Sequence, residues 1–453
     1  MIVMKFGGSS LADLDELRRV AKIIEARQEQ SPVVVLSAFG KTTDVLIQLA
    51  DKAMIVTEKE LIDELNDYFE PRLYRLIPGL VTDHGLQQSC LTEAKRIMQE
   101  LKNICRGLAL IKELTPRSLD TLMSYGELLS QTIMYYALKS RGVKAARVPA
   151  QTLIKTDSNF GSAKVDWAVT AQNIAEKLRP VLDSGEIPIV QGFIGSNAEE
   201  VTTTLGRGGS DYTAAILGAI GNAENIQIWT DVNGFLSADP RIIPEADIIP
   251  VMNIDEAKEM AQFGAKVLHP KTVLPAIEKN IPVHIKNTFH PQHDGTLLTA
   301  DKGRPGIHGI TVLRDLHRLT FEWDNATEKQ SVLAFEGLVT GEIFLSARTQ
   351  TSEVLYTRLR ENNEIAASLM SENEISADDR RSLIAIIGEE LQTSSAWFTE
   401  LIQLLEGSDY HIFTGSPQNN RWLIDVDETE VDHLLPKIYN QYFYEKEAEQ
   451  SIA

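Results

Sequence analysis

The sequence predicts an α/β fold with a mainly parallel sheet, followed by a smaller α+β region. Up to about residue 296, apolar runs of strand length alternate with amphipathic stretches of helical period, which is typical of a parallel sheet covered by helices. From residue 381 onward the order becomes strand, helix, strand, strand, helix, which is most of a ferredoxin-like unit.

The alternation begins with a short apolar strand, residues 2–6, which Gly7 and Gly8 interrupt. A helix is predicted next, with one apolar face that comprises Leu14, Leu17, Ala21 and Ile24. Asp13 and Glu16 have the spacing of a capping box at its start.

Further strands are expected at residues 33–37, 187–194, 226–231 and 281–286, and helices at residues 44–54 and after Ser210. Residues 55–117 are highly charged and of helical character. They predict a helical excursion from the sheet.

In the C-terminal part, residues 307–323 are expected to hold two strands, and residues 341–347 and 353–357 to form a hairpin. Strands are then expected at residues 381–387, 410–414 and 421–425, and helices at residues 393–405 and 430–442.

Composition excludes several classes of protein. The chain has 453 residues and a formal net charge of −20, so it lacks the basic excess that nucleic-acid binding requires. No apolar run has the roughly 18–20 residues that span a bilayer, and the N-terminus has no signal-peptide pattern. We therefore expect a soluble, cytoplasmic protein that binds neither nucleic acid nor membrane.

Cysteine and histidine usage indicates no metal site built from protein ligands. The two cysteines, Cys90 and Cys105, form no CxxC pair, so a disulfide framework or thiolate site is not expected. His284, His290 and His293 cluster, but their spacing fits no standard zinc pattern. We assign the histidines to a solvated loop.

The densest chemical signal is the glycine-rich segment at residues 202–211, with the sequence TTTLGRGGSD. Its glycines permit close backbone approach, and the helix that follows directs free N–H groups at a bound anion. Arg207 can grip a carboxylate or phosphate through two hydrogen bonds. A glycine turn capped by Ser210 or Asp211 explains the same residues without a ligand.

A second signal is the segment KFGGSS at residues 5–10, directly after the first strand. A lysine at a strand end beside two glycines can place its ammonium on phosphate oxygens. Lys5 is equally compatible with an edge lysine before a tight turn. The sequence has no P-loop, dinucleotide fingerprint, GxSxG elbow or HExxH helix.

Taken together, these motifs resemble the aspartate kinase family of the amino-acid-kinase fold. The resemblance covers the first ~300 residues and rests on ordered segments. Besides residues 5–10 and 204–211, they are LSA (36–38), YGE (125–127), QGFIG (191–195), WTDV (229–232), DPR (239–241) and FGAKVLHP (263–270). The tract from Gly192 into the glycine loop looks most like the lysine-sensitive monofunctional type.

The resemblance implies a domain plan and an assembly. It implies a catalytic domain at residues 1–297, a first ACT-like domain at 305–378, reduced and completed by C-terminal residues, and a second ACT domain at 379–446. It also implies a homodimer through the ACT domains, with a tetramer as the alternative. Two departures from the family pattern are Leu236, where a tyrosine is common near the adenine, and residues 329–331 (KQS), where the first ACT helix usually begins with glycine.

The resemblance further implies that the chain transfers the ATP γ-phosphoryl group to L-aspartate, with Mg²⁺ bridging the phosphates. The implied catalytic residues are Lys5, Asp211 and Lys266. The implied aspartate-binding residues are Ser37, Thr43, Glu127, Phe193 and Arg207. The implied ATP-binding residues are Gly7, Gly8, Ser9, Thr230, Asp231, Arg241 and again Lys266. No protein-ligated metal is implied.

Three alternatives stay open at this point. The first is a kinase of the same fold that phosphorylates glutamate, acetylglutamate, carbamate or a nucleotide. The second is an inactive amino-acid sensor, against which Lys5, Asp211 and Lys266 argue because all three are present. The third is the front part of a fused enzyme with a second activity.

Overall fold

The computed structural model describes residues 1–265, 267–269, 272–322, 342–348, 352–358, 376–414 and 421–444. The chain divides into two compact units. Unit 1 comprises Met1–Phe235, Pro250–Ile254 and Val267–Asp301, and unit 2 comprises Leu236–Ile249, Asp255–Lys266 and Lys302–Ala453.

Unit 1 is built on a sheet whose described strands have the order β3-β4-β2-β1-β7-β9-β10-β8. Every neighbouring pair is parallel except β9 with β10, which confirms the predicted mainly parallel sheet. The strands are β1 (Ile2–Phe6), β2 (Pro32–Leu36), β3 (Ala145–Val148), β4 (Ile187–Gln191), β7 (Ile226–Thr230), β8 (Val251–Asn253), β9 (Val283–Asn287) and β10 (Thr296–Thr299). β5 (Ile194–Ser196) and β6 (Thr202–Thr204) form a separate hairpin.

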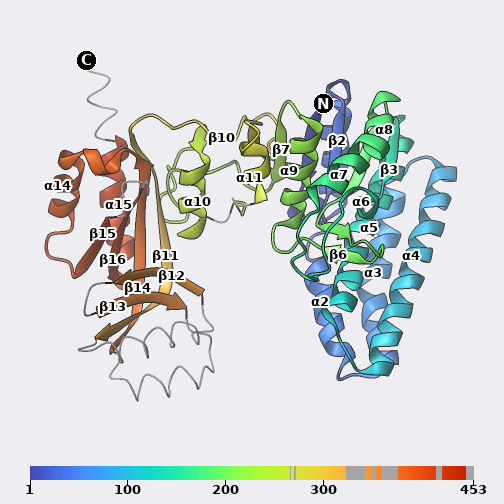
Figure 1. Ribbon diagram of the computed structural model, residues 1–453, viewed down its shortest axis with the longest axis horizontal. Helices are drawn as coiled ribbons and strands as arrows, with labels where there is room; N and C mark the ends of the chain where they lie inside the picture. Colours follow the sequence, from blue (N-terminus) through green and yellow to red (C-terminus); the bar gives the residue numbers. More distant parts are fainter. Residues whose placement is uncertain are drawn as a thin grey trace. The chain divides into compact units, whose positions relative to one another are not determined.

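The helices of unit 1 include a group of long ones that lie side by side, α3, α4 and α5 (Figure 1). They confirm the predicted helical excursion, and α5 extends it to Ser140. The helices are α1 (Leu14–Glu25), α2 (Thr42–Ala53), α3 (Glu58–Leu80), α4 (His84–Ile111), α5 (Pro116–Ser140), α6 (Ala150–Leu153), α7 (Trp167–Asn173), α8 (Arg179–Asp183), α9 (Gly209–Gly221) and α11 (Leu274–Ile277).

One apolar core joins the long helices to the sheet. Its buried side chains come from β1, β2, α1 to α5 and the ends of β3 and β4. Cys90 and Cys105, both on α4, belong to this core, and burial raises the pKa of each thiol to about 12. Such thiols stay protonated near neutral pH and are poor nucleophiles.

Helix starts differ in detail from the prediction. Asp13 is the N-cap of α1, as expected, and its carboxylate accepts from the Leu14 amide at 2.5 Å. That bond is to the first helical residue, whereas a capping box bonds the third. A complete capping box occurs instead at the start of α3, between Thr57 and Glu60.

Unit 2 contains an antiparallel sheet whose described strands have the order β12-β13-β11-β14-β16-β15 (Figure 1). The strands are β11 (Gly306–Glu322), β12 (Glu342–Arg348), β13 (Ser352–Arg358), β14 (Ser376–Glu389), β15 (Tyr410–Thr414) and β16 (Arg421–Asp427). The helices are α10 (Ile254–Gln262), whose first residue belongs to unit 1, α14 (Ser395–Leu404) and α15 (Val431–Tyr439).

The predicted order of strand, helix, strand, strand, helix is confirmed in β14, α14, β15, β16 and α15. The predicted hairpin is confirmed in β12 and β13. The prediction of two strands in residues 307–323 was wrong, because β11 is a single strand of 17 residues. Its pairing with β14 shifts register at several points, and irregularities of this kind bend a strand without ending it.

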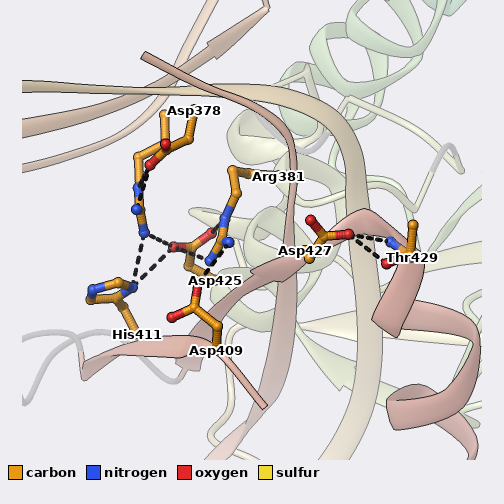
Figure 2. A network of polar contacts seen from close by, with 8 residues as sticks. Asp378, Arg381, Asp409, His411, Asp425, Asp427 and Thr429 are labelled. Atoms are coloured by element: carbon orange, nitrogen blue, oxygen red, sulfur yellow. Dashed lines mark hydrogen bonds and ion pairs between the residues drawn. The ribbon is translucent and has the colours of Figure 1, made fainter. Parts of the chain in front are cut away.

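A buried charge cluster ties the strands of unit 2 together (Figure 2). Asp425 on β16 is fully buried and accepts from Arg381 Nε at 2.8 Å, Arg381 Nη2 at 2.9 Å and Arg318 Nη1 at 2.8 Å. Arg318 also pairs with Asp378, and Arg381 with Asp409. The cluster therefore connects β11, β14 and β16, because each strand contributes at least one charged side chain.

Among the described residues, no helix combines the length and the apolar character needed to cross a bilayer. The cytoplasmic location stays a prediction from the sequence.

Candidate active site

Four central strands of unit 1 end at one edge of the sheet. In the parallel pairings, Phe6 at the end of β1 lies beside Leu36 of β2 and Trp229 of β7, and Leu36 lies beside Gln191 of β4. The loops after these strands therefore meet at the carboxyl edge, which is where α/β sheets bind their ligands.

A cavity of about 280 Å³ opens between these loops and the start of α9. It is polar, and it brings together residues that are far apart in the sequence. Its lining consists of Lys5, Gly8, Ser37, Ala38, Gly40, Thr43, Glu127, Phe193, Gly206, Arg207, Gly208, Gly209, Ser210 and Asp211. Two of the three predicted catalytic residues, all five predicted aspartate-binding residues and Gly8 are in this set.

Lys5 and Asp211 form a nearly buried ion pair at the floor of this cavity. Lys5 Nζ lies 2.6 Å from Asp211 Oδ1, and the two side chains are 11% and 10% exposed. Lys5 comes from the central strand β1, and Asp211 lies in the first turn of α9. A buried ammonium that is held beside a helix start is well placed to meet an anionic ligand.

Glycine is required where the loops crowd. A Cβ on Gly8 would lie 2.7 Å from the Gly40 carbonyl oxygen, so only glycine lets the loops after β1 and β2 approach this closely. Gly208 is the N-cap of α9 with φ of 74°, and a Cβ there would lie 2.8 Å from Thr272 Cγ2. The glycines predicted to shape an anion site therefore have a steric reason to be glycine.

Phe193 adopts a left-handed backbone conformation, with φ of 69°. This region is costly for a bulky side chain, and residues held there cluster at functional sites. Its amide donates to Thr213 Oγ1 at 3.0 Å, and its carbonyl accepts from the Leu205 amide at 2.9 Å. These bonds on both sides hold the strained residue against the glycine loop.

Glu127 is buried on α5, with 3% of its surface exposed. One carboxylate oxygen accepts from the Ala38 amide at 3.2 Å, and the other, Oε2, has no hydrogen-bond partner in the part of the chain that the structure describes. Burial raises the pKa of Glu127 to about 8. A buried acid with an open oxygen facing a cavity is stabilised by an incoming cation, since that cation would supply the missing partner.

Arg207 is exposed at the rim of the cavity, and among the described residues it has no acidic partner. Ser37 and Thr43 line the same cavity and are half-buried. A free guanidinium and a pair of hydroxyls in one cavity favour an anionic, hydrogen-bonding ligand.

The predicted nucleotide residues lie partly outside the cavity lining. The Gly7 amide donates to the Trp229 carbonyl at 3.1 Å, whereas the Gly8 amide has no partner among the described residues. Ser9 is exposed in the same loop. Thr230 ends β7 and Asp231 follows it at the same edge of the sheet, where Thr230 Oγ1 donates to Asp231 Oδ1 at 3.0 Å.

Arg241 does not line this cavity, and a second predicted residue is not described. Arg241 belongs to unit 2, where its guanidinium pairs with Asp239 at 2.6 Å and holds the pKa of that carboxyl below its ordinary value. Lys266 lies outside the described residues, as do residues 329–331.

Sequence reasoning missed Asp120, a fully buried carboxylate on α5 that binds the segment leading into the glycine loop. Only the buried position of an acid within a helix of apolar neighbours could have signalled it. His284, assigned to a loop from the sequence, lies instead within β9, and burial lowers the pKa of this imidazole. Among the described residues, no three His, Cys, Asp or Glu side chains gather as a metal cluster.

Comparison with known proteins agrees with this geometry. Residues 1–287 match the amino acid kinase family. The chloroplastic aspartokinase 3 of Arabidopsis thaliana is 32% identical, over 97% of this chain and 81% of that protein. The crystal structure of Escherichia coli aspartokinase III in complex with lysine and aspartate (T-state) has a TM-score of 0.84 and 30% identity, over 98% of this chain and 99% of that one.

The same E. coli enzyme in complex with aspartate and ADP (R-state) has a TM-score of 0.80 and 29% identity, over 98% of this chain and 100% of that one. Identity at this level over nearly the whole of both chains confirms the resemblance that the sequence motifs predicted, in fold as well as in family. The chain belongs to the amino acid kinase family and, within it, to the aspartokinases.

Proposed function

We propose that this protein is an aspartate kinase. It transfers the γ-phosphoryl group of ATP to the side-chain carboxylate of L-aspartate and forms 4-phospho-L-aspartate, the first step towards lysine, threonine and methionine. The observation that carries the proposal is the cavity of about 280 Å³ at the carboxyl edge of the sheet in unit 1. It combines the Lys5–Asp211 ion pair with the open carboxylate oxygen of Glu127.

Glu127 and Arg207 bind the amino acid. The substrate ammonium supplies the missing partner of Glu127 Oε2, and the guanidinium of Arg207 pairs with a substrate carboxylate. Ser37, Thr43 and Phe193 complete the pocket around the small side chain. Two charges of opposite sign in one cavity match a zwitterion better than they match a nucleotide.

Lys5 and Gly8 bind the transferred phosphoryl group. Lys5 is already desolvated, so its attraction to a phosphate oxygen is stronger than it would be in water. The free amide of Gly8 donates beside it, while Asp211 orients the ammonium. We assign Gly7, Ser9, Thr230 and Asp231 to the rest of the nucleotide. Lys266, for which the sequence resemblance implies a contact with the β- or γ-phosphate, lies outside the described residues.

Mg²⁺ fits this site as part of MgATP. The described carboxylates form no cluster for a resident ion, and Mg²⁺ in kinases is held largely by phosphate oxygens, waters and one or two carboxylates. When bound with the nucleotide, the ion would supply positive charge that offsets the negative charge developing during phosphoryl transfer.

The reaction needs no strong base, because the acceptor carboxylate is already ionised near neutral pH. A carboxylate oxygen attacks the γ-phosphorus, the bond from this phosphorus to the bridging oxygen of ADP breaks, and ADP leaves with that electron pair. The protein's task is to bring two anions together in line, which requires cations and fixed N–H donors at the meeting point.

We also propose the domain plan of residues 1–297, 305–378 and 379–446, with a homodimer through the C-terminal ACT domains and a tetramer as the alternative. The E. coli relative has been crystallised with lysine and aspartate together. Light scattering of the purified chain measures its mass in solution. A monomer at micromolar concentration would contradict the dimer.

An ADP-release assay with a panel of amino-acid acceptors tests the activity. We expect turnover with L-aspartate, and hydroxylamine should trap the product as aspartate hydroxamate, because an acyl phosphate reacts with it. Turnover with glutamate or acetylglutamate instead would favour another kinase of this fold. Amino-acid binding without any turnover would favour the inactive sensor.

A further inference from the structure

Asp120 holds together three segments of unit 1 that are distant in the sequence. Its carboxylate is fully buried on α5. Oδ2 accepts from the amide of Thr204 at 2.8 Å and from the amide of Gly161 at 2.9 Å, and Oδ1 accepts from the Thr204 hydroxyl at 2.8 Å. Both oxygens therefore have hydrogen-bond donors within the protein, whereas among the described residues only one oxygen of Glu127 has such a donor.

The two bonded segments support the loop that carries Arg207. Thr204 ends β6, and the glycine loop begins one residue later. The Gly161 carbonyl oxygen would lie 3.3 Å from a Cβ on Gly206, so the segment around Gly161 packs directly against that loop. Asp120 thus holds both the strand that enters the loop and the segment packed beside it.

The same helix carries Glu127. Asp120 and Glu127 are seven residues apart on α5, which is about 10 Å along the axis and nearly two full turns, so both side chains lie on one face. Glu127 faces the cavity, and Asp120 binds the base of the Arg207 loop. One rigid helix therefore links the two charges that we assign to the ends of the amino acid.

We propose that Asp120 is a positioning residue that sets the place of Arg207 relative to Glu127, and thereby the affinity for the amino-acid substrate. The inference rests on the proposed function. Asp120 does not line the cavity, so it acts through Thr204 and Gly161. Its effect falls on the amino acid more than on the nucleotide, because the loop it holds carries Arg207.

Asp120→Asn is a conservative variant that can keep all three hydrogen bonds. In Asp120→Asn, the amide oxygen can take the place of Oδ2 and accept from both backbone amides. The amide NH₂ then faces the Thr204 hydroxyl, which can rotate to accept. Asp120→Leu has a similar size but leaves the amides of Thr204 and Gly161 without this acceptor. The Thr204 amide is buried, so the loop has to move to hydrate it.

Steady-state kinetics and calorimetric binding of aspartate and ADP test the proposal on the full chain. For Asp120→Leu we expect the aspartate KM and Kd to rise at least about tenfold, because displacing a binding group by ~1 Å has effects of this size or larger. The ATP KM should stay within about twofold, and Asp120→Asn should stay within about threefold of wild type for both substrates.

Two further variants keep the test decisive. If Asp120→Leu does not fold, Thr204→Val removes only the hydroxyl bond, and we expect about a threefold rise in the aspartate KM alone. Asp83→Asn, which changes the N-cap acid of α4, is the matched control and should change neither KM.

Equal rises in the aspartate and ATP KM values, or an unchanged aspartate KM in Asp120→Leu and Thr204→Val, would overturn the proposal. A wild-type protein that uses another amino acid would overturn only the proposed substrate. The same ratios would then be measured with that acceptor.

Discussion

Unit 1 buries the carboxylate of Glu127 and unit 2 that of Asp425, and the two differ in how many of their oxygens have a partner within the protein. In unit 2, Asp425 accepts from two arginines, so the protein itself supplies its counter-charge. In unit 1, Glu127 has one backbone donor and an open oxygen, and its pKa is raised to about 8. The filled site connects strands, whereas the open one is where we propose that a cation from outside binds.

The largest effect, on the free energy of unfolding, is expected from replacing Asp425. Asp425→Ala removes the shared acceptor of the buried Arg381 and the half-buried Arg318, so we expect the local free energy of unfolding to fall by about 3–5 kcal/mol. Hydrogen exchange of the β14 and β16 amides measures it. Asp409→Ala, which removes the exposed partner of Arg381, is the control and should cost less than about 1 kcal/mol. If both variants lowered the free energy of unfolding by the same amount, the buried ion pairs of Asp425 would contribute no more than the exposed pair of Asp409.

The next effect concerns the ion pair in the cavity. Lys5→Ala should lower kcat at least about 100-fold, since removing one donor to developing charge typically has that effect. Steady-state turnover measures the loss, and circular dichroism checks the fold. Lys22→Ala changes an exposed lysine of α1 and should leave kcat unchanged. Near-wild-type turnover in Lys5→Ala would refute the assigned role.

Variants of Glu127 and Arg207 should change the aspartate KM, whereas variants of the nucleotide-binding residues should change the ATP KM. We expect Glu127→Ala and Arg207→Ala to raise the aspartate KM more than about tenfold and to leave the ATP KM within a few-fold, because each loses a charged hydrogen bond to the amino acid. Asp231→Ala should show the reverse split, because we assign Asp231 to the nucleotide. A large ATP defect with an unchanged aspartate KM would assign Glu127 or Arg207 to the nucleotide instead.

The raised pKa of Glu127 predicts a pH dependence. The folded protein holds a proton that the unfolded chain has lost, so between pH 4.5 and about 8 this group lowers the stability of the fold as pH rises. Pairing with an ammonium needs the ionised form. The aspartate KM should therefore fall several-fold, and at most about tenfold, from pH 7 to 8.5.

A pH series of aspartate KM values checks this expectation. Glu127→Gln has nothing to titrate, so its aspartate KM should be higher and flat over the same range. If the variant kept the wild-type pH slope, another group would be responsible for it.

The smallest effect on activity is expected from adding lysine, a product of the pathway. Residues 329–331 replace the glycine usual at the first ACT helix, which disfavours close backbone approach to a carboxylate. We expect sub-millimolar lysine to change activity less than about twofold. Titrations of lysine and of threonine at several aspartate concentrations measure it. Strong inhibition by lysine would show that glycine is not needed there.

Much of the cavity followed from the sequence because its residues occupy strand ends and glycine loops. In a parallel sheet the carboxyl ends of neighbouring strands share an edge, so Lys5, Ser37 and Phe193 had to meet once their strands were identified. The glycines at positions 8 and 208 were recognisable for the same reason, since their backbones come too close to neighbours for a side chain.

Other features depend on contacts between distant positions. The bonds of Asp120 span 84 and 41 residues, and an acid in a helical stretch is usually a solvated one. The single long strand β11 was also not predictable, since its irregular register appears only when β14 pairs with it. β3 was missed because its four residues have little apolar signal of their own.

The sequence by itself determined the sheet and helix layers of unit 1, the order of helices and strands along the chain from β14 to α15, and the types of side chain at the cavity. These depend on local period, turn residues and motif spacing, which are written along the chain. Only the tertiary structure decided that Glu127 keeps an open oxygen while Asp120 and Asp425 keep none. The number of donors that surround a buried carboxylate is set by segments that meet in space, and no single stretch of sequence contains them.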